Sequence, residues 1–308
     1  MTTTKVILDC DPGHDDAVAI VMAGRSPELD IIGITCVAGN VSVEHTTRNA
    51  LRICTLAEMP KIPVCKGMTR PLLGENRTAV DVHGITGLDG ADLPEPDREP
   101  HPIHAVDFLI ETLMTSNGDI TVIPTGPLTN IAMALLREPR LVRKIPQIVM
   151  MGGTMGIGNI TPSAEFNIYA DPEAAKVVFE SGILITMLGL DVTHQVILTH
   201  NHIVRLRAAN TRLTSTFADL LTFHLHALAK LGDTEGAAMH DPCAVMAVCE
   251  PSMLRTQFMH VDIETTGKFT RGRTVCDVRN RLGKTPNVHV GISINADRFF
   301  EHFFERVR

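Results

Sequence analysis

The stretch Ile7-Leu-Asp9-Cys-Asp11-Pro-Gly-His-Asp15-Asp16-Ala17 carries the most information about this chain. It begins as an apolar strand, turns at Pro12-Gly13 and continues into a helix whose first turn contains Asp15 and Asp16. Four carboxylates fall within eight residues, at the carboxyl end of the first expected strand. In open α/β sheets, ligands bind beyond that end of the strands, so this stretch predicts a fold and a site together.

Short β-branched runs alternate with longer amphipathic runs through the first two-thirds of the chain. This alternation predicts parallel βαβ units, and the nearly continuous apolar runs are typical of strands buried on both sides. We therefore predict an α/β protein with an open, mostly parallel central sheet and helices on both faces. The expected strands are Lys5–Asp9, Ile31–Ala38, Asp119–Pro124, Gln147–Met151 and Ile183–Leu190, and the expected helices are Asp15–Ala23, Val43–Glu58, Ala105–Thr115, Leu128–Leu136 and Pro172–Glu180.

The pattern changes after about Thr193. No linker, low-complexity segment or internal repeat interrupts the sequence, so we expect residues 1–308 to form a single domain. The stretch Gly67–His101 has no clear periodicity and is expected to be a long loop, either functional or mobile. The later elements are expected to be helices over Ile203–Leu231, Pro242–Cys249 and Arg298–Val307, and strands over Phe258–Thr265 and Asn287–Ile294.

Composition excludes several classes of protein. The net charge is -7, Trp is absent and Tyr occurs once, which argues against a nucleic-acid partner. No apolar run of about 18 residues predicts a membrane span, and the start of the chain does not resemble a signal peptide, so we expect a cytoplasmic protein without membrane contact. The seven cysteines are scattered without a CxxC pair, and we expect reduced thiols.

The acidic cluster around Asp11, Asp15 and Asp16 predicts a cation site. Packing several anions together is costly unless a cation neutralises them, and oxygen ligands favour Ca²⁺ or Mg²⁺ over zinc or copper. Because successive helical residues point about 100° apart, Asp15 and Asp16 should serve different partners, one a cation and the other a sugar hydroxyl. The local alternative is that Asp15 caps the helix and Asp11 initiates the turn.

Further polar motifs are expected at the same edge of the sheet. His240-Asp241-Pro242 is an ordinary helix start, except that a His beside a metal-bound carboxylate could protonate a leaving group. The loop from Gly158 to Asn167 offers amide and carboxylate groups suited to sugar hydroxyls, or is merely a polar surface loop. Weaker motifs are Ala38-Gly39-Asn40, Val82-His83-Gly84 and Pro124-Thr125-Gly126-Pro127.

Taken together, these motifs resemble the nucleoside hydrolases, the inosine–uridine-preferring N-ribohydrolases. The likeness follows the order of the motifs along nearly the whole chain. The matching segments are Asp9-Cys-Asp-Pro-Gly-His-Asp-Asp16, Val37-Ala-Gly-Asn40, Pro124-Thr-Gly126, Met151-Gly-Gly, Glu165-Phe-Asn167 and His240-Asp-Pro242.

The resemblance implies hydrolysis of the N-glycosidic bond of ribonucleosides with a tightly bound Ca²⁺. Asp11 is then the expected general base for water, His240 the first candidate to protonate the leaving base, and His83 a less favoured helper. A homodimer or homotetramer is also implied. The metal ligands are expected to be Asp11, Asp16, the Thr125 carbonyl and Asp241, and the substrate contacts Asp15, Asn40, His83, Met151, Asn159, Glu165, Phe166, Asn167 and His240.

These motifs do not define the base preference. Pyrimidine-preferring relatives carry a Gln and a Tyr before the His-Asp-Pro motif, where this chain has Leu228 and Gly232. His224, His226 and Leu228 are candidates for lining the base pocket, and we expect broad or pyrimidine-leaning specificity. Two other classes stay open here: a haloacid-dehalogenase-like phosphatase, which also has Asp-x-Asp after its first strand, and a non-catalytic nucleoside- or ribose-binding protein.

Overall fold

The computed structural model describes residues 3–60, 62–232 and 236–308, which are built around one eight-stranded sheet. Its strands are β1 (Thr4–Cys10), β2 (Leu29–Cys36), β3 (Val64–Lys66), β4 (Ile120–Pro124), β5 (Ile148–Met151), β6 (Ile185–Leu188), β9 (Leu254–Met259) and β12 (Val288–Ile294). Their order across the sheet is β3-β2-β1-β4-β5-β6-β12-β9. Every neighbouring pair is parallel except β12 and β9.

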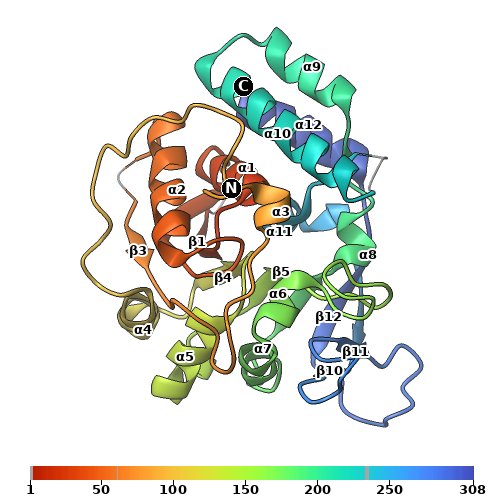
Figure 1. The fold of residues 1–308 in the computed structure, drawn as a ribbon. Coiled ribbons are helices and arrows are strands. Elements are labelled where there is room, and N and C mark those ends of the chain that lie inside the picture. The colour runs from red at the N-terminus through yellow and green to blue at the C-terminus, as the bar shows by residue number, and fades with distance from the viewer. Residues whose placement is uncertain (1–2, 61, 233–235) are drawn as a thin grey trace.

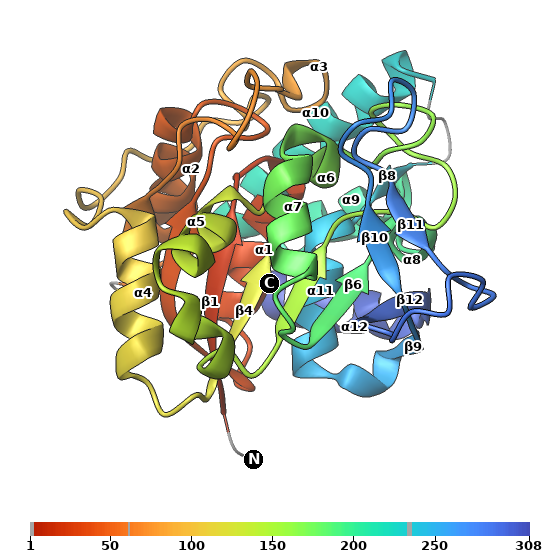
Figure 2. The ribbon, with the colours of Figure 1, turned by 90° about the horizontal axis from the view of Figure 1, so that it is seen from below.

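Helices cover both faces of this sheet (Figures 1 and 2). Alternate residues of β1 point to opposite faces, so Val6 and Leu8 join one hydrophobic cluster while Ile7 joins the other. Both faces are thus fully packed, as the apolar strands require. One face carries α1 (His14–Gly24), α2 (Val43–Leu56), α11 (His240–Cys249) and α12 (Ala296–Val307), and the other carries α4 (Ala105–Thr115), α5 (Thr129–Arg137) and α7 (Pro172–Phe179).

The remaining elements complete the C-terminal part and the edge where the parallel strands end. In Figure 2, α3, α6 and α10 gather beyond that edge. These elements are the helices α3 (Val80–His83), α6 (Phe166–Ala170), α8 (Leu190–Thr193), α9 (His200–Ala208) and α10 (Arg212–Lys230), the 3₁₀ turns Pro139–Arg143 and Pro251–Met253, the pair β7 (Ile197–Leu198) and β8 (Ala237–Ala238), and the pair β10 (Val261–Ile263) and β11 (Thr274–Cys276).

The predicted fold class is confirmed, and most expected elements lie within a few residues of their observed bounds. Three details differ. The expected strand Phe258–Thr265 is divided between β9, which pairs with β12, and β10, which pairs with β11. The helical stretch Ile203–Leu231 is interrupted at Asn210, whose φ of 51° cannot continue a right-handed helix. The expected loop Gly67–His101 contains the short helix α3.

Two further observations concern the state of the cysteines and the length and polarity of the helices. All seven cysteines are free; five are buried and two half-buried. No helix within the described ranges is both long enough and apolar enough to cross a bilayer.

Candidate active site

Carboxylates from the two ends of the chain meet beyond the carboxyl end of β1. Asp11 follows β1, and Asp15 and Asp16 lie in the first turn of α1, where free backbone N–H groups favour negative charge. Asp241 lies in the first turn of α11, which packs against α1. All four side chains are buried, and carboxylate oxygens of Asp15, Asp16 and Asp241 lie within 4.8 Å of one another.

Asp11 adjoins this cluster and has one carboxylate oxygen to spare. Its Oδ2 accepts the backbone N–H of Asn40 at 2.7 Å, whereas its buried Oδ1 has no hydrogen-bond partner among residues 3–60, 62–232 and 236–308. Gly39 and Gly126 press against the same carboxylate, and a Cβ on Gly126 would lie 2.5 Å from Oδ1. The Asp11 side chain is therefore fixed in position, with an unused acceptor that suits a cation or a water molecule.

Burial and mutual repulsion shape the protonation of the cluster. Burial raises the pKa of Asp15 to about 7, and the neighbouring Asp16 adds to this effect. The pKa values of Asp11 and Asp241 are raised well above the ordinary range by burial and then by adjacent carboxylates. Without a cation these groups hold protons to avoid like charge, and a bound divalent ion would reverse that preference. The donor set consists of oxygens and therefore fits a hard divalent ion.

Thr125 and Asn167 link the cluster to the opposite side of the site. The Thr125 hydroxyl donates to Asp16 Oδ1 at 2.8 Å, and the Thr125 carbonyl accepts from Asn167 Nδ2 at 2.7 Å. Both contacts are buried. The Thr125 carbonyl, expected as a metal ligand, is thus already oriented, and its second lone pair is available.

Two residues expected to contact sugar also build the loop that carries them. Glu165 caps α6: its Oε1 accepts the N–H of Asn167 at 2.8 Å and its Oε2 accepts the N–H of Gly153 at 2.9 Å. Asn159 Oδ1 accepts the N–H of Phe166 at 2.9 Å, and Asn159 itself is exposed. Burial raises the pKa of Glu165 to about 7. These contacts hold the loop after β5 against the site.

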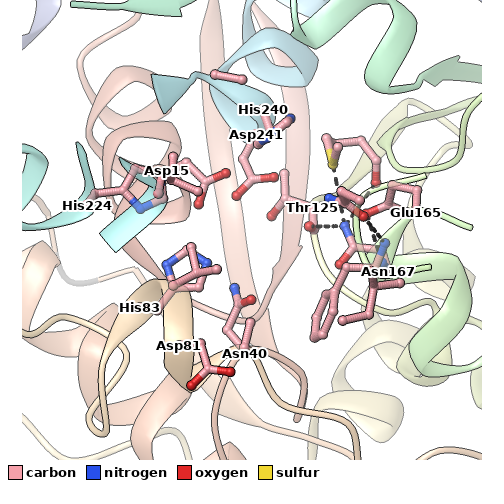
Figure 3. A pocket seen from close by; sticks show the side chains of 18 of the residues that line it. Asp15, Asn40, Asp81, His83, Thr125, Glu165, Asn167, His224, His240 and Asp241 are labelled. Atoms are coloured by element: carbon pink, nitrogen blue, oxygen red, sulfur yellow. Dashed lines mark hydrogen bonds between the residues drawn. The ribbon is translucent and has the colours of Figure 1, made fainter. Parts of the chain in front are cut away.

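A pocket of about 530 Å³ opens above the carboxylates. In Figure 3, Asp15 and Asp241 lie near its centre, Glu165 and Asn167 lie on one side, and His83 and His224 lie on the other. The expected substrate contacts are all among its lining residues. They are Asp15, Asn40, His83, Met151, Asn159, Glu165, Phe166, Asn167 and His240, whereas Asp11 and Asp16 are buried and are not among the lining residues.

Several lining residues were not predicted from the sequence. His194 follows α8 and lies with its ring centroid 5.6 Å from that of His240. Leu231 and Ala238 flank the stretch before α11, and Asp81 comes from α3. None of these stands in a pattern that marks a site, because they reach the pocket only through the packing of α3, α8 and α10 around the sheet edge.

Comparison with known proteins identifies the class to which this fold and site belong. Residues 6–301 match the model of the inosine-uridine preferring nucleoside hydrolases. The pyrimidine-specific ribonucleoside hydrolase RihB of Escherichia coli (strain K12) is 44% identical over 308 residues, which cover 100% of this chain and 98% of that protein. The chain therefore belongs to the nucleoside hydrolase family.

Solved structures agree with this assignment. A purine-preferring ribonucleoside hydrolase from Gardnerella vaginalis superimposes with a TM-score of 0.92 at 36% identity, covering 98% of both chains. The plant nucleoside hydrolase PpNRh1 superimposes with a TM-score of 0.94 at 34% identity, covering 99% of both chains. The protein is thus a ribonucleoside hydrolase that cleaves N-glycosidic bonds, and its family is metal-dependent. This excludes the phosphatase and the non-catalytic binder as alternatives.

Proposed function

We propose that the carboxylate cluster holds Ca²⁺ and that the pocket above it positions the ribose of a nucleoside for attack by water. The ligands are Asp11, Asp16, Asp241 and the Thr125 carbonyl. The observation that carries the proposal is the convergence of buried acidic side chains with an unpartnered Asp11 Oδ1. An oxygen-only donor set of this kind suits Ca²⁺, which takes six to eight oxygen ligands.

The ribose hydroxyls are bound by Asp15 and by the amides and carboxylate that surround the cluster. Side-chain oxygens of Glu165 and Asn159 already accept hydrogen bonds from backbone N–H groups. Each carboxylate or amide oxygen has a second lone pair, which can accept a hydrogen bond from a sugar hydroxyl. Met151 and Phe166 supply apolar contact. The pocket volume lies in the range of small-molecule sites. The proposed hydroxyl ligands are Asp15, Asn40, Asn159, Glu165 and Asn167.

Asp11 is the general base of the proposed mechanism. A Ca²⁺ ion held by Asp11, Asp16, Asp241 and the Thr125 carbonyl would lower the pKa of water and would help to fix the ribose. Asp11 Oδ2 is held by Asn40, so the free Oδ1 is available to take the proton from the attacking water. The surrounding carboxylates stabilise the positive charge that develops in the sugar ring of an oxocarbenium-like transition state.

His240 assists departure of the base, with His83 as a secondary candidate. Burial, followed by the nearby His194, lowers the pKa of His240 to about 3, so its imidazole is neutral at pH 7. A neutral imidazole can still donate a hydrogen bond from one ring nitrogen. We expect His240→Ala to reduce turnover of uridine or inosine far more than turnover of a nucleoside with a pre-activated leaving group. Equal losses on both substrates would remove His240 from this role.

The substrate preference is broad or pyrimidine-leaning. The relative named for pyrimidine specificity is 44% identical, and the one named purine-preferring is 36% identical. Leu228 lines the pocket, whereas Gly232 does not appear among the lining residues. An apolar side chain at position 228 offers no hydrogen bond to a particular base, which favours breadth over strict selection.

Measuring calcium content together with ribose release tests the proposal. The purified protein should contain one Ca²⁺ per chain and should release ribose and free base from uridine, cytidine, inosine and adenosine, fastest from the pyrimidines. Removing the ion with a chelator should abolish release, and Ca²⁺ should restore it. Full activity in metal-free protein would contradict the calcium site, and Asp11→Ala with wild-type rates would contradict the base. The proposed homodimer or homotetramer is tested by light scattering.

A further inference from the structure

Three buried histidines from separate elements meet beside the carboxylate cluster. His14 is the first residue of α1, His83 the last residue of α3, and His224 lies within α10. A ring nitrogen from each lies within 4.8 Å of the other two. Their ring centroids are 5.2 to 5.4 Å apart and their planes differ by 18° to 23°. This histidine triad plays no part in the hydrolytic mechanism above except through the secondary role of His83.

We propose that the histidine triad of His14, His83 and His224 is a binding site for a divalent transition-metal ion such as Zn²⁺ or Co²⁺, separate from the Ca²⁺ site. Imidazole nitrogen suits this class of ion, whereas Ca²⁺ prefers oxygen.

Unpartnered nitrogens provide independent support. Both ring nitrogens of His224 are buried and have no hydrogen-bond partner among the described residues. A neutral imidazole carries one N–H and one lone pair, and leaving both unpaired in the interior costs free energy. In Figure 3, His224 and His83 lie on the same side of the pocket. A metal ion between them would use the buried lone pair of His224.

The contact between His14 and His83 points the same way. His14 Nε2 lies 2.9 Å from the carbonyl oxygen of Asp89, which can only accept, so this nitrogen carries the hydrogen. A neutral His14 therefore turns the lone pair of Nδ1 toward His83 Nδ1, 3.2 Å away. His83 Nδ1 also presents a lone pair, because it accepts the backbone N–H of His14 in a long contact of 3.2 Å.

The lone pairs on Nδ1 of His14 and Nδ1 of His83 face and repel each other. A cation between the two nitrogens would accept both lone pairs and so relieve the repulsion. Zn–N bonds of about 2.0–2.1 Å in a tetrahedral site place two ligand nitrogens about 3.3 Å apart, close to the separation found for His14 and His83. The ion would take the His83 lone pair from the weak backbone contact. Three protein nitrogens would leave a fourth position for water.

The surroundings favour neutral histidines, which are the metal-binding form. Burial, together with the neighbouring imidazoles, lowers the pKa values of His83 and His224 well below the ordinary value. Gly13 makes the approach possible, since a Cβ there would lie 2.6 Å from His83 Nδ1.

Occupation of this site should inhibit hydrolysis. His83 and His224 line the substrate pocket, while the buried His14 is not among the lining residues. An ion on their nitrogens would remove these groups from contact with the base and place positive charge in the pocket wall. Inhibition by Zn²⁺ in the presence of saturating Ca²⁺ would thus arise from the histidine triad and not from displacement of Ca²⁺.

Cobalt spectroscopy on the tag-free, calcium-loaded protein tests this proposal directly. With Ca²⁺ in excess to occupy the carboxylates, titration with Co²⁺ should produce intense visible absorption typical of tetrahedral nitrogen ligation, saturating at one equivalent. Zn²⁺ should then abolish the absorption. Only the weak bands of six-coordinate, oxygen-ligated Co²⁺, or the absence of stoichiometric binding, would overturn the proposal without any variant.

Paired variants on one helix then locate the ion. His224→Phe removes a ligand, whereas His226→Phe, two residues further along α10, changes an exposed histidine that the triad does not include. We expect His224→Phe and His83→Phe to weaken Co²⁺ binding at least about 100-fold and His226→Phe to leave it unchanged. Unchanged affinity in folded His224→Phe, checked by circular dichroism, would place the ion elsewhere and reject the triad.

Discussion

The Thr193 hydroxyl and Nδ1 of His240 lie 2.8 Å apart at the edge of the pocket. Thr193 is the last residue of α8 and His240 the first of α11, so the contact joins two elements that meet beyond the sheet. His240 is neutral because burial lowers its pKa to about 3. Within the described residues the Thr193 hydroxyl has no other acceptor, so it donates to Nδ1 and leaves the hydrogen of His240 on Nε2.

Thr193→Val should therefore impair base departure. Loss of this hydrogen bond frees the ring to rotate and to change tautomer, and a net hydrogen bond of about 1 kcal/mol corresponds to a decrease in kcat of roughly 5- to 10-fold. Steady-state kinetics on uridine should show the decrease with little change in KM. Thr193→Ser should retain most of the rate. A nucleoside with a pre-activated leaving group should be hydrolysed almost normally, and an equal loss on that substrate would indicate general damage instead.

Gly126→Ala should weaken Ca²⁺ binding by the carboxylate cluster, because the added methyl group clashes with Asp11. The added Cβ would lie 2.5 Å from Asp11 Oδ1, a distance that real Cβ atoms do not adopt. We expect Asp11 to be displaced, Ca²⁺ affinity to fall about 100-fold or more in calorimetry, and ribose release to fall with it. The matched control is Gly156→Ala on the exposed loop after β5, where the nearest atom would be 3.3 Å away. Normal calcium binding in Gly126→Ala would show that Asp11 is not a ligand.

Most of the sheet and its helices can be predicted from the sequence, because the hydrophobic patterns that indicate them are local. β1, α1, α4 and β4 each contain a complete apolar period, and the observed bounds of α4 equal the predicted ones. β3 has only three residues, too few to display a period, and it was not predicted. The division of Phe258–Thr265 into β9 and β10 depends on two separate pairing partners. Pairing is a long-range property that no local pattern records.

The site was predictable only where its residues belong to motifs. Asp11, Asp16 and Asp241 lie in motifs that resemble those of the nucleoside hydrolases, and the structure brings Asp16 and Asp241 together with Asp15. His194 and Asp81 reach the pocket through the packing of α8 and α3, which sequence patterns do not specify. The histidine triad was missed for the same reason, since His14, His83 and His224 are far apart in the chain. The ligand roles themselves stay predictions.

Asp9 should make the metal-free protein less stable as the pH rises. Its side chain is fully buried, and burial raises its pKa from 3.8 to about 7 although Thr35 and Asn130 donate to Oδ1. Between about pH 4 and 7 the folded state therefore binds one proton more at Asp9 than the unfolded state does. The stabilisation that this proton contributes is fully present below about pH 4 and is lost as the pH rises towards 7. The slope amounts to at most about 1.4 kcal/mol per pH unit.

Asp9→Asn removes this contribution. Chemical denaturation in a chelator between pH 4.5 and 8 should show a shallower fall in the free energy of unfolding than for the wild type, and relative stabilisation at pH 8. Asp119→Asn is the control, because Lys5 lowers the pKa of the exposed Asp119 carboxyl and it stays ionised throughout this range. Parallel pH profiles for wild type and Asp9→Asn would show that Asp9 is ionised in the folded state.

Asp15 and Asp241 lie in the same carboxylate cluster, yet the proposal gives them different partners. Asp241→Asn should weaken Ca²⁺ binding about 100-fold, whereas Asp15→Asn should bind Ca²⁺ nearly normally and lose a charged hydrogen bond to a ribose hydroxyl. Such a bond contributes about 1.5–3 kcal/mol, so kcat/KM should fall roughly 10- to 150-fold at saturating Ca²⁺. Calorimetry with Ca²⁺ and kinetics on uridine separate the two effects. If Asp15→Asn loses calcium as completely as Asp241→Asn does, Asp15 is a metal ligand, and the remaining proposed residues, Asn40, Asn159, Glu165 and Asn167, must hold the ribose.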